Sequence, residues 1–184
     1  MKDRNMDEEI KNKIKKIRIL ILDVDGVLTD GRIILNDAGQ ESKHFDVKDG
    51  HGLKMIMRYG IDVILLTGRS SSVVMHRAND LGIREVFQGI LNKKEFFQQL
   101  ISERGLNPEE IAYIGDDFVD VPLLKRSGFS VAVKDAVSEV KQFADFITDN
   151  PGGRGAVREV CDLILKVQDK WAEVAERYEL GGYE

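Results

Sequence analysis

The sequence contains a single cysteine, Cys161, which excludes a disulfide bond within the chain. One cysteine is typical of proteins from a reducing compartment. No apolar run approaches the ~20 residues of a membrane-spanning helix. Residues 1–16 are charged throughout and lack the apolar centre of a signal peptide. We therefore expect a cytoplasmic protein that does not insert into a membrane.

An excess of positive charge is also missing. Lys and Arg number 27 against 32 Asp and Glu, which gives a net charge of −5. No broad positive field therefore attracts nucleic acid or an anionic membrane, and neither is expected as a partner. A chain of this charge can hold a phosphate group only where it gathers cations locally or binds a metal ion.

Internal repeats, low-complexity tracts and Pro- or Ser-rich linkers are absent from the 184 residues. A hydrophobic content of 42% beside 32% charged residues is typical of a folded globular chain. The length suits one domain with one sizeable core. We expect a charged extension at residues 1–16 and a single domain at residues 17–180.

The most informative stretch is IRILILDVDGVLTDG at residues 17–31. Its first six residues form an apolar, β-branched run that is typical of a buried strand. The strand ends at Asp23, and Asp25 follows two positions later, so both side chains point the same way if the backbone stays extended. Unpaired carboxylates are costly to bury. The pair therefore predicts a site for a cation or a phosphate complex.

Apolar strands alternate with helices along the rest of the chain. Strands are predicted at 61–66, 85–87, 111–114, 129–133 and 146–147, and helices at 50–59, 70–81, 92–104, 136–143 and 156–178, with another helix beginning near Pro122. This alternation predicts an α/β protein with three layers and a mainly parallel sheet. Ligands of such sheets bind beyond the carboxyl ends of the strands. Three strands end there in polar clusters, at Asp23/Asp25, Thr67-Gly68-Arg69 and Asp116-Asp117.

In this order the clusters, together with Lys93, resemble the four motifs of the haloacid dehalogenase (HAD) phosphohydrolases. The resemblance covers nearly the whole chain and implies a Rossmann-like HAD core. It implies that Asp23 is a nucleophile that forms an aspartyl-phosphate, and that Asp25 is the general acid/base. Thr67 would hold the phosphoryl oxygens, and Lys93 would neutralise the nucleophile and the phosphate. Lys94 competes for the last role, although the Asn-Lys pair after a Gln-Gly turn favours Lys93.

The same resemblance implies a magnesium ion held by Asp23, the backbone carbonyl of Asp25, and Asp116. Hard oxygen ligands are those that Mg²⁺ prefers. The cation is also required electrostatically, because three carboxylates would otherwise repel an anionic phosphate.

Five stretches, DVKDGHG, LLTGRSS, NDLGI, FQGILNK and PGGRGAVREVCDLIL, resemble the HAD phosphatases that act on 3-deoxy-D-manno-octulosonate 8-phosphate in lipopolysaccharide precursor synthesis. This resemblance implies hydrolysis of that ester to the free sugar acid and phosphate. The substrate contacts that it implies are Asp25, Asp46, Val47, Lys48, Asp49, Gly50, Lys54, Gly68, Arg69, Arg77 and Lys93. Several cations suit a ligand that carries a carboxylate far from its phosphate.

This chain departs from that group at three of these positions. The group commonly has Asn where Asp46 stands, and Arg where Lys48 and Lys54 stand. Lysine keeps the positive charge but lacks the bidentate fork of arginine. The departures weaken the substrate assignment slightly and leave the reaction type unchanged.

Residues 31–45 alternate around a turn-forming NDAGQ and predict a short β-hairpin flap. Only this hairpin and one helix fit between Asp25 and Thr67, and no long insertion follows Thr67. We therefore expect no large cap domain. HAD phosphatases without a cap tend to handle large substrates or use neighbouring subunits as the cap. On that basis we predict a homotetramer in which the hairpin pairs between subunits.

Other functions compete with this one. Phosphatases of nine-carbon, neuraminate-type keto sugar phosphates tend to carry acidic residues where Arg69 and Arg154 stand, so the eight-carbon sugar is favoured. A phospho-receiver signalling module also unites aspartates, a Thr and a Lys. In receivers the acid pair lies on the first strand and the accepting Asp on a later one, whereas this chain has its Asp-x-Asp on the first strand and Asp116-Asp117 only after Thr67 and Lys93, which argues against a receiver. A catalytically silent HAD-like interaction domain is a third alternative, and retention of every motif residue argues against it.

Overall fold

The apolar run that begins at residue 17 forms β1 (Ile19–Leu22), an interior strand of a six-stranded sheet. It pairs in parallel with β4 (Asp62–Leu66) and with β6 (Ile111–Gly115). Strands β5 (Glu85–Phe87), β7 (Phe129–Ala132) and β8 (Phe146–Ile147) complete the parallel order β5-β4-β1-β6-β7-β8. The computed structural model describes residues 6–181. The predicted parallel sheet is confirmed.

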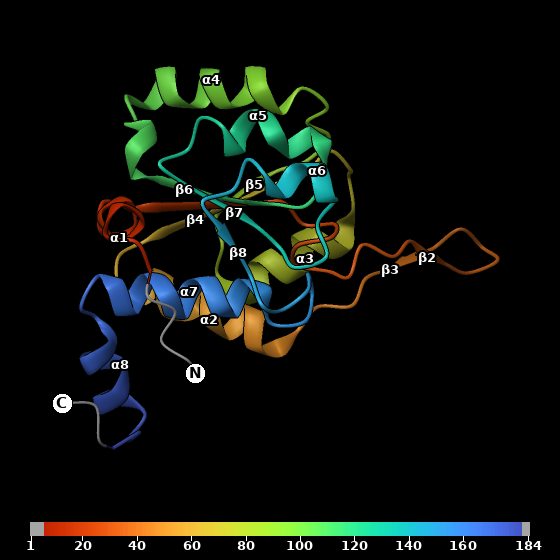
Figure 1. Ribbon diagram of the computed structural model, residues 1–184. Coiled ribbons are helices and arrows are strands. Elements are labelled where there is room, and N and C mark those ends of the chain that lie inside the picture. Colours follow the sequence, from red (N-terminus) through yellow and green to blue (C-terminus); the bar gives the residue numbers. More distant parts are fainter. Residues whose placement is uncertain (1–5, 182–184) are drawn as a thin grey trace.

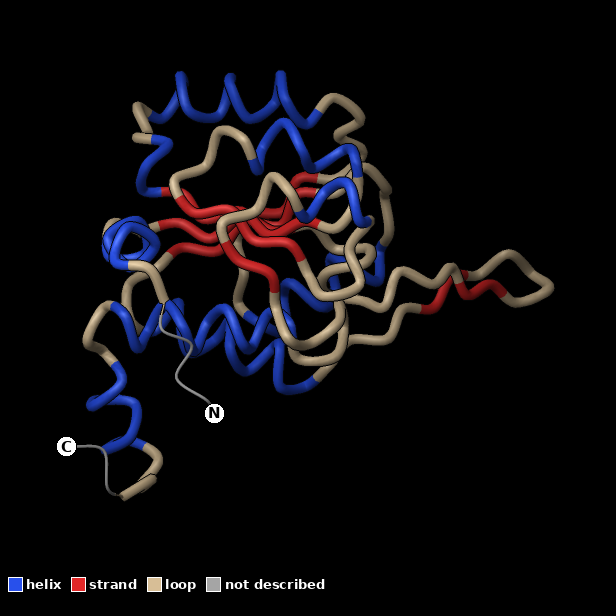
Figure 2. The backbone as a smooth tube through the Cα atoms, in the orientation of Figure 1, coloured by secondary structure: helices blue, strands red, loops and turns tan. Residues whose placement is uncertain are grey.

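Helices cover both faces of this sheet and make three layers (Figures 1 and 2). Successive residues of β1 point to opposite faces, because the side-chain period of a strand is two. Leu20 and Leu22 therefore pack in one core cluster and Ile21 in the other. The first face carries α1 (Glu8–Lys15), α2 (Val47–Arg58), α3 (Ser72–Leu81) and α7 (Ala156–Val167), and the second carries α4 (Lys93–Arg104), α5 (Val121–Leu124) and α6 (Ser138–Lys141).

Two short 3-10 turns, Pro108–Glu110 and Phe118–Asp120, precede β6 and α5. The helix predicted near Pro122 is therefore only the four-residue α5. Helix α2 begins at Val47, three residues earlier than predicted, because the carboxylate of Asp46 accepts the backbone N–H of Lys48 at 2.6 Å and caps the helix.

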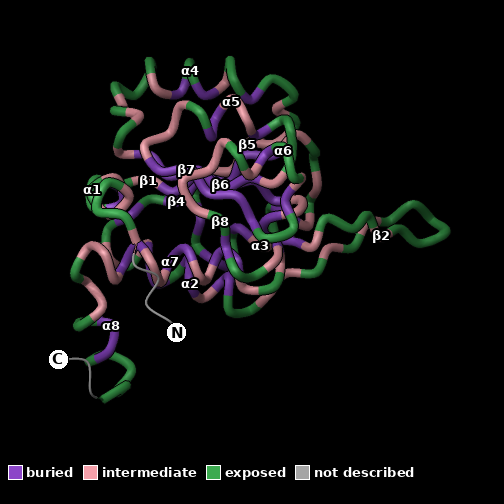
Figure 3. Tube along the Cα trace, in the orientation of Figure 1, coloured by how far each residue is buried: buried purple, intermediate pink, exposed green. Residues whose placement is uncertain are grey.

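The predicted hairpin is present, with short antiparallel strands β2 (Ile34–Leu35) and β3 (Glu41–Ser42). The side-chain oxygen of Asn36 accepts the backbone N–H groups of Ala38 and Gln40 at 3.1 and 2.9 Å and forms the turn. The hairpin projects from the body, and most of its residues are exposed (Figure 3). No inserted cap domain appears between residues 6 and 181.

Helix α1 lies within the segment predicted as a charged extension, of which residues 1–5 lie outside the described part. Asp7 caps the helix by accepting the N–H of Glu9 at 3.0 Å. Ile14 is fully buried in the cluster that also contains Leu20 and Leu22. The carboxyl end of this segment is therefore packed on the domain.

The single long helix predicted for residues 156–178 is wrong. The structure has two helices, α7 and α8 (Trp171–Arg177), separated by Asp169 in a left-handed conformation with φ of 58°. The N–H of Lys170 reaches the carbonyl of Leu165, and the N–H of Asp169 reaches that of Lys166, a Schellman ending that is usually built on glycine. Gln168 holds the break in place by donating to the carbonyls of Ile14 and Ile17. No helix among residues 6–181 has the length and apolarity needed to cross a membrane.

Candidate active site

Asp23 lies directly after β1, at the carboxyl edge of the sheet, and is 6% exposed. Its Oδ1 accepts the backbone N–H of Val24 at 2.6 Å, and its Oδ2 lies 2.7 Å from Nζ of Lys93. The chain then turns at Gly26, whose φ of +90° favours glycine. A buried carboxylate with one oxygen fixed by the backbone and the other beside an ammonium group is held in one orientation, and the ammonium group favours its charged form.

Lys93 is the first residue of α4, which Asn92 caps by accepting the N–H of Glu95. Its side chain is 2% exposed, and Nζ lies 2.7 Å from both Asp23 and Asp120. The neighbouring Lys94 is exposed. Of the two lysines that the sequence offered, the structure brings Lys93 to the acidic cluster.

Asp23, Asp116 and Asp120 each offer a carboxylate oxygen within 4.8 Å of the others. Asp120 is fully buried and saturated: Oδ1 accepts the hydroxyl of Tyr113 at 2.6 Å and pairs with Lys93, while Oδ2 accepts the N–H groups of Asp116 and Asp117. Asp120 therefore orients its neighbours. The sequence alone gave it no role, because its partners come from four other positions.

A carboxylate oxygen of this cluster lacks a donor. Oδ1 of Asp116 is buried and has no hydrogen-bond partner among residues 6–181. Burial, followed by the charges of Asp120 and Asp23, raises the pKa of Asp116 to about 8. Burial and Asp120 also raise the pKa of Asp23 to about 6, against the opposing effect of Lys93. This donor set fits a hard divalent cation such as Mg²⁺, which would compensate the repulsion.

Thr67 follows β4, the neighbour of β1, and is 2% exposed. Its hydroxyl oxygen accepts the backbone N–H of Arg69 at 3.2 Å, which tightens the turn after the strand. Gly68, between them, is partly buried. The parallel register therefore brings the Thr-Gly-Arg cluster to the same sheet edge as the aspartates, as the sequence predicts.

Asp25 faces the base of the hairpin, where it forms an ion pair with Lys43, while Asp23 pairs with Lys93. Nε of Arg69 lies 3.8 Å from the other carboxylate oxygen of Asp25. The two acids therefore have different cations as partners. Lys43 is a residue that the sequence reasoning missed; its spacing of two from Glu41 on one strand face was the available signal.

Arg77, a predicted substrate contact, lies beside two others, Gly50 and Asp46, at the start of α2. The guanidinium of Arg77 packs on Gly50, where a Cβ would lie 2.2 Å from Nη2. Arg77 also pairs with Asp80 at 2.7 Å and lies over the ring of Phe45. Its Nη2 is 3.5 Å from the carbonyl of Asp46, so these residues form one surface. Val47, Lys48 and Lys54 are exposed.

Asp49 is not brought to this surface as an available carboxylate. It is fully buried, and its oxygens accept the N–H groups of Gly155 and Arg158 at 3.1 and 2.7 Å. Burial raises its pKa against these bonds. The side chain joins α2 to the start of α7, and no sequence pattern indicated this long-range contact.

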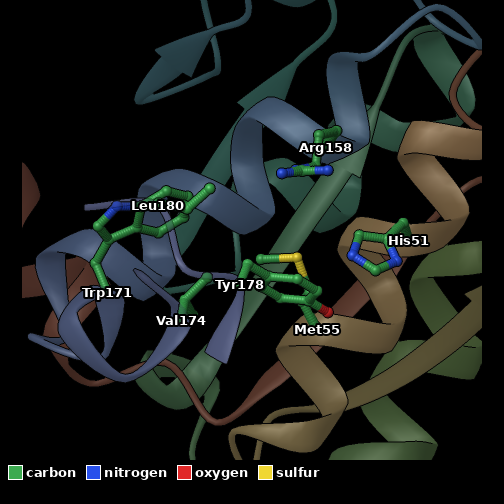
Figure 4. A pocket seen from close by; sticks show the side chains of 7 residues that line it. All are labelled: His51, Met55, Arg158, Trp171, Val174, Tyr178 and Leu180. Atoms are coloured by element: carbon green, nitrogen blue, oxygen red, sulfur yellow. The ribbon is translucent and has the colours of Figure 1, made fainter. Parts of the chain in front are cut away.

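A separate pocket of about 370 Å³ lies between α2, α7 and α8 (Figure 4). Its walls are mainly apolar, with Arg158 and His51 as polar members. The ring of His51 stands edge-on to that of Tyr178, with centroids 5.5 Å apart. Burial and nearby arginines lower the pKa of His51. None of the residues predicted for catalysis or substrate contact lines this pocket.

Comparison with known proteins identifies a matching family model and relatives of similar sequence. A model of haloacid dehalogenase-like hydrolases matches residues 78–160. The 3-deoxy-D-manno-octulosonate 8-phosphate phosphatase KdsC of Escherichia coli is 45% identical over 165 residues, which cover 90% of this chain and 88% of that protein.

Solved structures agree with this comparison. The phosphatase of the same name from Moraxella catarrhalis, in complex with magnesium, phosphate and KDO, has a TM-score of 0.90 and 40% identity over 93% of this chain and 98% of that one. A cobalt-bound form of the Haemophilus influenzae phosphatase has a TM-score of 0.82 and 44% identity over 86% and 92% of the two chains.

Proposed function

The chain belongs to the haloacid dehalogenase-like hydrolase family, and from this membership we propose that it hydrolyses 3-deoxy-D-manno-octulosonate 8-phosphate to the free sugar acid and phosphate. The arrangement that carries the proposal is the buried Lys93 beside Asp23, with the unsatisfied oxygen of Asp116 nearby. The relatives at 45% identity are phosphatases for this ester. The product is a precursor sugar of lipopolysaccharide.

In the proposed reaction a carboxylate oxygen of Asp23 attacks phosphorus and forms an aspartyl-phosphate as the bond from phosphorus to the sugar oxygen breaks. Asp25 donates a proton to the departing sugar oxygen, then accepts a proton from the water that cleaves the phosphoenzyme. Lys93 keeps Asp23 charged, and the hydroxyl and backbone of Thr67 hold phosphoryl oxygens. Asp23, the carbonyl of Asp25 and Asp116 would hold a magnesium ion, which would supply the positive charge that lets an anionic phosphate approach.

We assign the sugar acid to the cationic surface beside α2 and β4. Arg69 and Arg77 provide guanidinium groups suited to a carboxylate, and Lys48 and Lys54 are exposed nearby in sequence. Gly50 leaves room for the guanidinium of Arg77, and Gly68 lets the ligand approach the backbone closely. For Asp49 we retain a supporting role through the backbone, since its carboxylate caps α7.

Assembly into a homotetramer through the hairpin is part of the proposal. Ile33 and Leu35 are 61% and 60% exposed on the projecting hairpin, which supports pairing with another copy. Light scattering of the wild type and of an Ile33→Ser/Leu35→Ser variant tests it, and a wild-type monomer would contradict it. The single, buried Cys161 supports a cytoplasmic location.

The experiment that tests the function is phosphate release from a panel of sugar phosphates, with Mg²⁺ and with EDTA. The eight-carbon keto acid phosphate should be hydrolysed fastest, and EDTA should abolish turnover. Faster hydrolysis of a nine-carbon keto acid phosphate would replace the substrate assignment. Absence of phosphate release from every ester would contradict a phosphatase function.

A further inference from the structure

We propose that Lys43, on the hairpin, is a positioning residue that holds the carboxylate of Asp25 for its two proton transfers. The inference rests on the proposed function, in which Asp25 is the general acid/base. It assigns the hairpin a part in the catalytic centre in addition to its predicted part in assembly.

The burial of Lys43 is the first observation. The hairpin is largely exposed, yet the side chain of Lys43 is only 2% exposed. Its ammonium group forms an ion pair with Oδ1 of Asp25 and lies 3.5 Å from Glu41. A buried lysine is tolerated only where opposite charges compensate it. Lys43 is therefore committed to Asp25, which lies at the sheet edge where the proposed catalytic residues gather, and to Glu41 of β3 on the hairpin.

The second observation is that the contacts form a closed arrangement of four charges. Glu41 pairs with Arg69 at 2.7 Å, and Arg69 lies 3.8 Å from the second oxygen of Asp25. Each oxygen of Asp25 thus faces a different cation, and Glu41 lies beside both cations. Two acids balance two bases, so the group carries no net charge and the buried ammonium of Lys43 is compensated.

This arrangement fixes the direction of a short side chain. Asp25 has rotational freedom about two bonds, and the strong contact at Oδ1 comes from Lys43. Without that contact the carboxylate would turn toward Arg69, the remaining cation. The consequence is a misplaced proton donor and acceptor, since these transfers need an aligned partner within about 3 Å.

The two steps of the reaction depend on Asp25 differently. With a sugar phosphate, the P–O bond to the sugar breaks and the departing alkoxide needs the proton of Asp25. With p-nitrophenyl phosphate the departing phenolate is stable without a proton, so Asp23 can still be phosphorylated. Hydrolysis of the phosphoenzyme needs Asp25 with either ester, because the attacking water must lose a proton. A displaced Asp25 therefore makes the phosphoenzyme accumulate from the aryl ester.

The experiment compares Lys43→Met and Lys43→Gln with Lys43→Arg, which keeps the cation. Turnover of the sugar phosphate should fall about 10- to 100-fold in both neutral variants. Rapid mixing with p-nitrophenyl phosphate should show a burst of p-nitrophenolate, near one per active site, followed by slow release. Lys43→Arg should recover most of the sugar phosphate activity and show a smaller burst.

Arg32→Met is the matched control, because Arg32 lies on the other leg of the hairpin and pairs with Asp30. It should behave as wild type, and light scattering should give equal masses for all variants. An equal loss with both esters and no burst, or unchanged kinetics, would overturn the proposal for Lys43. Inactivity of the wild type toward the sugar phosphate would instead contradict the proposed function.

Discussion

Gly152 packs directly on the carbonyl oxygen of Gly26, so that a Cβ on Gly152 would lie 1.7 Å from that oxygen. The backbone N–H of Gly153 also donates to the carbonyl of Val27 at 2.8 Å. The loop before α7 therefore supports the turn that carries Asp23 and Asp25.

Gly152→Ala should displace the turn and destabilise the protein by about 1–3 kcal/mol, since the clash is with backbone. Phosphate release should fall with it. Thermal and urea unfolding, together with turnover, measure both effects. Gly68→Ala is the stability control, because its Cβ would meet only a carbonyl at 3.7 Å. Equal stability of the two variants would contradict the close packing.

Asp23→Asn should lower phosphate release by more than about a thousandfold, because an amide cannot act as the nucleophile. The fold should survive, as the amide retains the shape of the carboxylate. Asp62→Asn, an exposed aspartate at the amino end of β4, should keep wild-type turnover. Undiminished hydrolysis by Asp23→Asn would remove this residue from the mechanism.

Lys93→Met should destabilise the protein by about 3–5 kcal/mol, because it leaves the buried Asp23 and Asp120 without their shared cation. Activity should also fall sharply. Lys94→Met should change neither property, since that side chain is exposed. Urea unfolding and phosphate release distinguish the two lysines, and equal effects would contradict the assignment of Lys93.

The raised pKa of Asp116 predicts how stability depends on pH without metal. The folded protein holds a proton on Asp116 up to a pH of about 8, whereas the unfolded chain releases it near the ordinary value of 3.8. The stabilisation is therefore complete below the ordinary value and is lost as pH rises through about 8. In EDTA, the free energy of unfolding of wild type relative to that of Asp116→Asn should fall as the pH rises from 3.8 to about 8.

The comparison with Asp116→Asn removes the contribution of other titrating groups, among them His51, whose lowered pKa acts in the opposite direction. Saturating Mg²⁺ should remove the fall, because a bound cation favours the charged carboxylate. Urea unfolding at several pH values measures how the relative stability changes with pH in EDTA and in saturating Mg²⁺. A relative stability that rises with pH in EDTA would contradict the buried, repelled state of Asp116.

The sheet and the polar ends of its strands could be predicted because each depends on a short stretch of chain. A buried strand has a local apolar pattern, as in β1, and parallel pairing then places Thr67 near Asp23. The family motifs favoured Lys93 rather than Lys94 as the lysine beside the nucleophile, and the burial of Lys93 supports that choice.

Other features could not be predicted because their causes lie far away in sequence. The break between α7 and α8 is fixed by Gln168, which bonds to carbonyls about 150 positions earlier. Asp49 looked like a substrate contact within its own motif, yet its oxygens cap α7. Neither partner is visible in the local pattern.

By itself, the amino-acid sequence determined the layered α/β architecture and the set of carboxylates that meet at one edge, since strand periodicity and turn chemistry are local properties. Only the tertiary structure showed that Lys43 is the cation paired with Asp25, whereas the family motif had already indicated Lys93 for Asp23. The reason is that burial and charge compensation depend on elements that come together only when the chain folds.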